Sequence, residues 1–283
     1  MEWLSYSQQC LGIVHSPLTD QMLELTPQVI LLALLSGAIV GVFLGAFGGG
    51  GSVLAAPLLL YVVGVEDAHI AIGTSAAGVA AIALFSLIGH WRGGRVKWPC
   101  AIIFAMAGLF GSIVGSSAAK VTQSDFLMLG FATAMLAIAL SMFREPKFAG
   151  DPDVMFQPSM MLKLVPLGLI VGCAAGFFGI GGGFLIVPGL MLAVGMTMAN
   201  ATASSLVSVV IFGATTSANY ALSDFVDLRL ALLLLGGGII GGTIGIFLAK
   251  ALINHIRIAR IAFAVMVIAV AIFVAWNSIS NLY

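Results

Sequence analysis

Long apolar stretches run through almost the whole chain, and only short polar or glycine-rich breaks separate them. A helix that crosses a membrane needs about 20 mostly apolar residues, so these stretches predict an all-α polytopic membrane protein with about eight to ten spanning segments. Five apolar segments fall in each half of the chain, and the second of each half is long enough for only about half of the hydrocarbon thickness. The segments are Gln28 to Phe47, Val53 to Val63, Ala68 to Gly89, Trp98 to Ala119, Phe126 to Phe143, Leu162 to Phe178, Phe184 to Gly195, Ala199 to Ala221, Leu230 to Ala249 and Ile258 to Ser278.

The two halves are related in sequence. The run Gly37 to Gly51 matches the run Gly168 to Gly182 at a constant offset of 131 residues, and after one gap the offset becomes 130. At the second offset Ala71 to Ala76 falls on Ala201 to Leu206. Because self-similarity of this kind marks duplicated architecture, we predict two membrane repeats. The expected division is a lead-in at 1–27, repeat 1 at 28–143, a linker at 144–161 and repeat 2 at 162–283.

The charges in the short loops predict how the repeats are oriented. Lysine and arginine are enriched in cytoplasmic loops, so Arg92, Arg95 and Lys97 place the loop after the third segment in the cytoplasm. The equivalent loop of the second half, 222–229, is acidic and should lie outside. The linker is then cytoplasmic, both termini are periplasmic, and the two halves are inverted relative to each other. Inverted repeats with discontinuous helices are typical of secondary transporters.

The overall composition excludes several classes of protein. Hydrophobic residues make up 61% of the chain and charged residues 8%, far from the composition of a soluble domain. The formal net charge is zero, without a basic patch, so nucleic acid is not an expected partner. Cys10, Cys100 and Cys173 are scattered without metal-ligand spacing, and we predict neither a metal site nor a cofactor. The expected partners are the lipid bilayer and a small solute, and a homodimer is compatible with the composition.

Two glycine runs are the strongest local features. Gly48 to Gly51 and Gly179 to Gly183 each lie between a long segment and a short one, where several glycines together should break the helix. Broken backbone inside a membrane must face protein or a wet cavity, and the short helix that follows directs free N–H groups into it, which favours an anion. We expect these helices to begin near Ser52 and Phe184. The candidate binding residues are Gly49, Gly50, Gly51, Ser52, Gly181, Gly182 and Gly183.

Other glycines have a simpler interpretation. The alternative for the runs themselves is that they only permit close helix packing. Packing is the role that we assign to the two Gly-x-x-x-Gly series upstream of the breaks. These series are Gly37, Gly41 and Gly45 in the first half and Gly168, Gly172 and Gly176 in the second.

Hydroxyl groups recur at equivalent positions near the start of the third segment of each half. Thr74 and Ser75 match Ser204 and Ser205, and Asn200 lies close by. Buried hydroxyls in membrane helices often bond only the carbonyl of the preceding turn. Their recurrence in both halves favours a second role as donors to a ligand.

The third segment of the first half ends with titratable and charged side chains. His90 is followed by Arg92, and Tyr220 is its counterpart in the second half. An interfacial histidine beside a tryptophan is commonly a residue of the aromatic belt. Because histidine titrates near neutral pH, His90 is also the candidate for proton coupling or gating, with Arg92 and Tyr220.

No acidic residue lies inside an apolar segment. All eleven fall in tails, loops or segment ends, which argues against a cation antiporter with a central aspartate. An intramembrane metalloprotease or serine hydrolase is disfavoured for the same reason, and we predict that the protein is not an enzyme. A thiol relay through Cys100 and Cys173 is a weak alternative.

The glycine breaks that precede Pro57 and Pro188, the Ala71 to Ser75 element and the duplicated layout resemble the TauE/SafE sulfite exporter family, also called the toluene sulfonate uptake permeases. The resemblance covers about residues 28–280. It implies a multi-pass carrier of the bacterial inner membrane for small sulfur-containing anions such as sulfite, sulfoacetate or related organosulfonates. The second half departs from the Thr-Ser pattern, having Ser204 and Ser205.

Together these patterns predict a secondary transporter of a small sulfur-containing anion, with export by alternating access. A membrane potential that is negative inside drives an anion outward, so export needs no coupled ion. Two alternatives are an anion channel of the same architecture and a proton-coupled uptake permease for sulfonates or another small organic anion.

Overall fold

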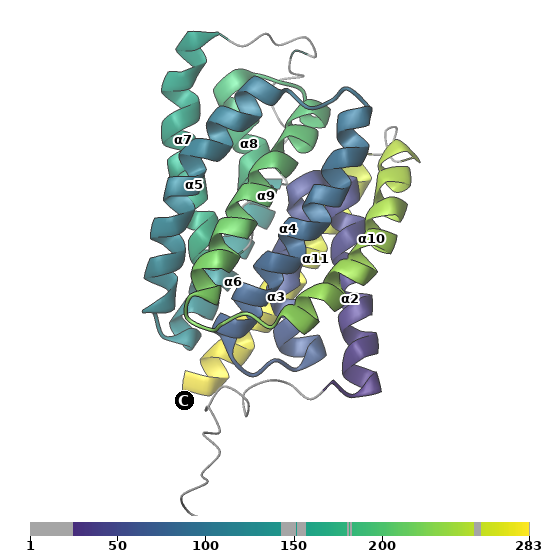
Figure 1. Cartoon of the computed structure of the whole chain (residues 1–283), viewed down its shortest axis with the longest axis vertical. Helices are drawn as coiled ribbons and strands as arrows, with labels where there is room; N and C mark the ends of the chain where they lie inside the picture. The colour runs from purple at the N-terminus through teal and green to yellow at the C-terminus, as the bar shows by residue number, and fades with distance from the viewer. Residues whose placement is uncertain are drawn as a thin grey trace, which may run out of the picture.

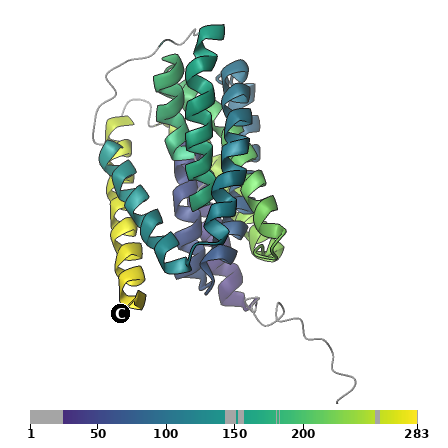
Figure 2. The ribbon, with the colours of Figure 1, turned by 90° about the vertical axis from the view of Figure 1, so that its left-hand side faces the viewer.

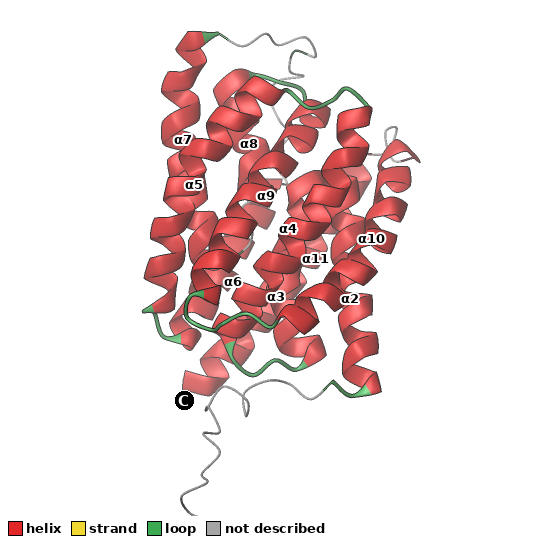
Figure 3. Cartoon of the chain, in the orientation of Figure 1, coloured by secondary structure: helices red, strands yellow, loops and turns green. Residues whose placement is uncertain are grey.

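The computed structural model describes residues 25–142, 151, 157–179, 181, 183–251 and 256–282. Within this part of the chain every regular element is a helix, and Figure 3 shows no strand. The all-α prediction is therefore confirmed. The elements are α2 (Pro27–Phe47), η1 (Gly48–Leu54), α3 (Ala55–Leu58), η2 (Leu59–Val63), α4 (Ala68–Arg92), α5 (Trp98–Lys120), α6 (Ser124–Met142), η3 (Pro158–Met160), α7 (Met161–Phe178), α8 (Gly183–Val194), α9 (Met198–Ala221), α10 (Leu228–Ala251) and α11 (Ile256–Leu282).

The helices reproduce the predicted apolar segments closely. Among the described residues six helices are long and apolar enough to cross a membrane, and four further apolar helices are shorter. The short second segment of each half is one of those four, as the pattern predicts. Most of the lead-in 1–27 and of the linker 144–161 lies outside the described residues. The chain is thus a polytopic membrane protein.

The first short segment differs in detail from the prediction. Its helical turns begin at Gly48 rather than near Ser52, and they pass from 3-10 (η1) through α (α3) to π geometry (η2). The tight start is possible because Gly51 approaches α2, where a Cβ on Gly51 would lie 2.8 Å from the Cβ of Phe43. The second short helix, α8, begins at Gly183, one residue before its expected start. The glycines of the first run are therefore part of the helix rather than a loop.

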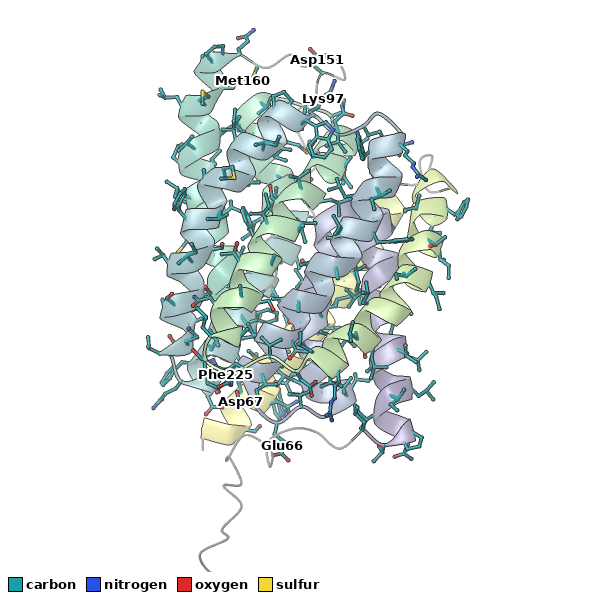
Figure 4. All side chains as sticks on the ribbon, viewed as in Figure 1. Glu66, Asp67, Lys97, Asp151, Met160 and Phe225 are labelled. Atoms are coloured by element: carbon teal, nitrogen blue, oxygen red, sulfur yellow. The ribbon has the colours of Figure 1, made fainter. Side chains whose placement is uncertain are left out.

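Equivalent helices of the two halves run in opposite directions. Figure 4 places Asp67, which precedes α4, at the lower end of the molecule, and Lys97, which follows α4, at the upper end. The second-half counterpart, α9, runs the other way and leads to Phe225 at the lower end (Figures 1 and 4). These directions are those that inverted repeats require. The orientation of the two halves in a bilayer stays a prediction.

The two halves are interleaved. In Figure 1, α2 of the first half lies against α10 of the second, and α7 of the second half lies against α5 of the first. The counterparts α4 and α9 pack on each other in the middle, and Figure 2 shows α6 beside α11 at one edge of the bundle. Each half therefore depends on the other for its packing.

Small residues make the interleaved contacts close. A Cβ on Gly41 would lie 2.7 Å from the backbone nitrogen of Gly242, and a Cβ on Gly172 would lie 2.5 Å from the α-carbon of Gly108. The first contact joins α2 to α10, and the second joins α7 to α5. Such positions exclude any side chain, because backbone fills the space. The packing role predicted for the Gly-x-x-x-Gly series is confirmed.

Candidate functional site

Both long helices that precede the short ones end at a glycine with a left-handed backbone. The φ angle is +67° at Gly48 after α2 and +65° at Gly179 after α7, and it is +64° at Gly181. Residues with a Cβ pay about 1–2 kcal/mol for the αL conformation of Gly179, and Gly48, with a ψ of −137°, lies in a region that is essentially restricted to glycine. The predicted helix breaks are therefore present at equivalent positions in both halves.

Each break lies against the central helix of the opposite half. A Cβ on Gly48 would lie 2.6 Å from Cγ2 of Thr202 and 3.2 Å from Oγ of Ser205, both in α9. Gly179 is pressed in the same way against Ile72 of α4, which is the counterpart of Thr202. The short helical elements η1 and α8 also pack on each other. The two breaks thus meet where the halves are in contact.

Gly181 lies between the two central helices. A Cβ added there would be 3.3 Å from Cγ1 of Val209 in α9 and 3.4 Å from Cγ1 of Val79 in α4. These two valines are counterparts in the repeat. Gly181 is therefore in contact with both central helices, at positions that correspond in the two halves.

The remaining break residues form the first turns of the short helices. Gly183 begins α8, whose first N–H groups have no carbonyl partner within the helix. Gly50, Gly51 and Ser52 are buried in η1. Gly49 belongs to the same element, whereas Gly182 lies outside the described residues. None of these described break residues carries a charged side chain, so their backbone groups are the polar groups that they offer.

Two of the predicted hydroxyls have a structural partner that the sequence did not indicate. The backbone N–H of Asp227 donates to Oγ1 of Thr74 at 2.9 Å, and the backbone N–H of Lys97 donates to Oγ of Ser204 at 2.9 Å. The two bonds are equivalent in the repeat. Each fastens a central helix to the loop that precedes α10 or α5. Contact of Thr74 or Ser204 with a substrate stays a prediction.

The neighbouring serines bond the helical turns against which the breaks pack. Ser205 donates to the carbonyl of Thr202 at 2.8 Å, and Ser75 donates to the carbonyl of Ile72 at 3.0 Å. Both hydroxyls thus bond the carbonyl of the preceding turn, which is the common role of buried hydroxyls in membrane helices, rather than being already free to donate to a ligand. The same two turns, however, are those against which Gly48 and Gly179 pack. Ser75 and Ser205 therefore lie beside the breaks as an equivalent pair.

Asn200 lies at the start of α9, about one turn before Ser204 and Ser205. Its backbone N–H donates to Oγ1 of Thr197, the cap of that helix, at 3.4 Å. The side chain is half-buried. Asn200 thus lies in the first turn of α9, two residues before the Thr202 that Gly48 contacts, and its contact with a substrate stays a prediction.

His90 and Tyr220 are equivalent in the repeat but lie at opposite ends of the molecule. His90 is buried, and its Nε2 lies 3.4 Å from the carbonyl oxygen of Gly45 in the last turn of α2, where carbonyls lack helical partners. Tyr220 is fully buried, and its hydroxyl has no hydrogen-bond partner among the described residues. Arg92 is exposed. The proton-coupling role of these side chains stays a prediction.

Comparison with known proteins identifies the family of the chain. The family model described as sulfite exporter TauE/SafE matches residues 33–274. The chain belongs to the TauE/SafE family. No solved structure matches it significantly.

Relatives of this TauE/SafE protein are named as transporters. A probable membrane transporter protein of Xylella fastidiosa (strain 9a5c) is 44% identical over 262 residues, which cover 91% of this chain and 99% of the relative. The probable membrane transporter protein YdhB of Bacillus subtilis is 28% identical over 223 residues, covering 77% of this chain and 87% of the relative. The chain is accordingly a multi-pass membrane transporter.

The TauE/SafE chain also contains polar features that sequence patterns did not reveal. Lys120 of α5 donates to Asn219 of α9, and His69 of α4 lies against Tyr220 of α9. Both pairs join residues about 100 or more positions apart, and neither has an equivalent at the matching positions of the other half, where Gly89 and Ala199 stand for Asn219 and His69. The only sign of these two pairs in the sequence is that the two halves carry different residues at these positions.

Proposed function

We propose that this transporter exports a small sulfur-containing anion, such as sulfite, sulfoacetate or a related organosulfonate, by alternating access. The observation that carries the proposal is the meeting of the two glycine breaks with α4 and α9 between the halves. Membership of the TauE/SafE family supports the substrate class through the sulfite exporter description.

The chemistry of the breaks favours an anion with several oxygens. The first N–H groups of α8 have no carbonyl partner within the helix and carry partial positive charge, and the candidate site has no carboxylate among its described residues. Ser75 and Ser205 would each turn a hydroxyl proton from the preceding carbonyl to a substrate oxygen. Sulfite and sulfonate groups present three oxygens on one sulfur, which suits donors arriving from two sides.

The pseudo-symmetric arrangement supports a carrier mechanism. A site shared by counterpart helices can open to either end when one half moves against the other. Because the lower end of the molecule carries the acidic loops and the upper end carries Arg92, Arg95 and Lys97, we place the upper end in the cytoplasm. An inside-negative potential then drives a bound anion toward the lower end by about 2.3 kcal/mol per charge per 100 mV.

Transport by purified protein in proteoliposomes tests the proposal. Vesicles loaded with sulfite or methanesulfonate should release the anion when the potential is set negative inside, and unlabelled substrate outside should drive saturable counterflow of labelled substrate. Unitary currents without saturation would instead establish a channel. Absence of any flux with sulfite, thiosulfate, sulfoacetate and methanesulfonate would reject the substrate class.

A further inference from the structure

Two aromatic rings from opposite halves lie together at the lower end of the bundle. The ring of His69, in the first turn of α4, is 6.2 Å from the ring of Tyr220, in the last turn of α9. The Phe225 ring contacts both, at 5.4 Å from His69 and 6.3 Å from Tyr220. Figure 4 shows Phe225 and Asp67, the neighbours of this cluster, at the same end.

Both polar rings have a buried atom without a partner. Nδ1 of His69 and the hydroxyl of Tyr220 are shielded from solvent, and neither has a hydrogen-bond partner among the described residues. Tyr220 is 0% exposed. Polar atoms buried without a partner are costly and rare, and ionisable side chains in membrane proteins usually mark an ion or proton site. The pair is therefore a candidate for binding a small ligand that the protein chain does not supply.

The surrounding charges select a proton rather than a second anion. Asp67 lies two residues before His69, and its Oδ1 accepts the backbone N–H of His69 at 2.6 Å. Across the loop, Oδ1 of Asp227 is engaged by the backbone N–H of Arg229 at 2.8 Å. Carboxylates outnumber cations among the described residues of this end, so the local charge repels a second anion and favours a small cation. The charged and titratable groups described here are Glu66, Asp67, Asp125, Asp224, Asp227, Lys120, Arg229, Tyr61 and Tyr220.

The pair occurs at one end only. The positions equivalent to His69 and Tyr220 in the other half are Ala199 and His90, and His90 is engaged with the carbonyl of Gly45. The glycine breaks and the Ser75–Ser205 pair, by contrast, recur in both halves. The His69–Tyr220 pair therefore makes the lower end chemically different from the upper end. The glycine breaks and the two serines do not, because both halves have them.

We propose that His69 and Tyr220 form a proton-binding site that makes the transporter an anion/proton antiporter, a proposal that rests on the transport function above. After the anion leaves at the lower end, a proton from the water there adds to the Nδ1 lone pair of His69, and the Tyr220 hydroxyl oxygen accepts a hydrogen bond from it. The proton returns to water on the opposite side after the carrier reorients. The O–H bond of a hydronium ion breaks as this N–H bond forms, and the same exchange in reverse returns the proton to water.

Proton movement during transport tests the site. Methanesulfonate stays ionised, so it carries no proton itself. Proteoliposomes loaded with it and with a pH-sensitive dye should acidify inside as the anion leaves. His69→Gln and Tyr220→Phe should lose the acidification while voltage-driven efflux remains. Phe225→Leu, which alters the same aromatic cluster without a titratable group, should keep it.

A second measurement does not depend on transport. Ring-proton NMR in detergent should show a pH titration of His69, assigned by its loss in His69→Gln, and the midpoint should move in Tyr220→Phe. Efflux without acidification in the wild type, or wild-type acidification in both variants, would overturn the antiport. Absence of efflux would instead reject the proposed function, and a His69 that does not titrate would then reject the proton site.

Discussion

The ammonium group of Lys120 donates to both the backbone carbonyl and the side-chain oxygen of Asn219, at 2.9 Å each. It also donates to Oγ of Ser223 at 3.0 Å, while Asn219 donates to Oγ of Ser116 at 2.6 Å. Lys120 ends α5 of the first half, and Asn219 lies near the end of α9 of the second. The network therefore ties the two halves together at the lower end.

At the upper end, two of the equivalent positions carry apolar residues. Gly89 stands in the place of Asn219 and Ile246 in the place of Ser116, and a Cβ on Gly89 would lie 2.9 Å from Cδ1 of Ile246. The two ends thus differ in how the halves are joined. Among the described side chains, the Lys120–Asn219 network is found at the lower junction, whereas the matching positions of the upper junction are in close apolar contact.

Lys120→Met should destabilise the protein, because it keeps most of the aliphatic stem but leaves both Asn219 oxygens without their donor. We expect a loss of about 1 to 2 kcal/mol, since Lys120 is only partly buried and water replaces some of the bonds. Thermal unfolding in detergent measures it. Lys163→Met, at an exposed lysine in the first turn of α7, is the matched control, and equal Tm values for the two variants would contradict the role of the network.

Gly172→Ala should prevent correct packing of α7 on α5. The added methyl group would overlap the carbonyl oxygen of Gly108, and backbone on both sides leaves no room to relax. The expected result is a large loss of folded protein in the membrane, measured by fluorescence-detected size exclusion. Gly236→Ala is the control, because its Cβ would lie 3.4 Å from the end of the Leu34 side chain. Equal yields would show that the interleaved contact is wrong.

Thr74→Val should lower stability without changing substrate affinity. Its hydroxyl is the acceptor for the backbone N–H of Asp227, and a buried N–H left without an acceptor costs about 1 to 3 kcal/mol. Thr133→Val, which removes a hydroxyl that bonds the Leu129 carbonyl of its own helix, should be nearly neutral. Unfolding curves and calorimetric titration check both quantities. Normal stability with weakened binding would make Thr74 a substrate ligand, as the sequence alone predicts.

Loop accessibility should report inverted halves. In a background with all cysteines replaced by serine, Leu222→Cys places a thiol at the lower end and Arg92→Cys places one at the upper end, both at exposed positions. A membrane-impermeant maleimide should label Leu222→Cys in intact cells. Labelling of Arg92→Cys should require permeabilised cells. Labelling of both in intact cells would contradict the assigned orientation.

The positions of the helices could be predicted from the sequence because each helix coincides with a continuous run of mostly apolar residues. Ala68 and Trp98 begin their helices as predicted, and the break at Gly48 follows from the weak helix propensity of glycine. The geometry after the break was not predictable: η1, α3 and η2 depend on how closely Gly51 approaches α2. Local pattern describes an element, whereas tertiary contact sets its hydrogen-bond geometry.

The candidate site was predictable in part for a related reason. The glycine breaks and the Ser75–Ser205 pair could be predicted because they occur at equivalent positions in both halves. Such a repeat can be recognised within a single sequence. The partners of Thr74 and Ser204 are backbone N–H groups of distant loops, which carry no residue-type signal. His69 contacts Tyr220 and Lys120 bonds Asn219, and the matching positions of the other half repeat neither pair. Comparing the two halves therefore shows only that these positions differ, not which residues are in contact.

The central claim is that the anion binds between the halves where the two glycine breaks meet α4 and α9. Calorimetric titration of sulfite against the Ser75→Ala/Ser205→Ala protein tests it most directly, with Ser280→Ala as control for loss of a hydroxyl that bonds the preceding turn away from the site. Loss of two donors to a charged ligand should weaken the Kd by about tenfold or more. A Kd equal to that of the wild type, in a double variant of normal stability, would contradict the claim.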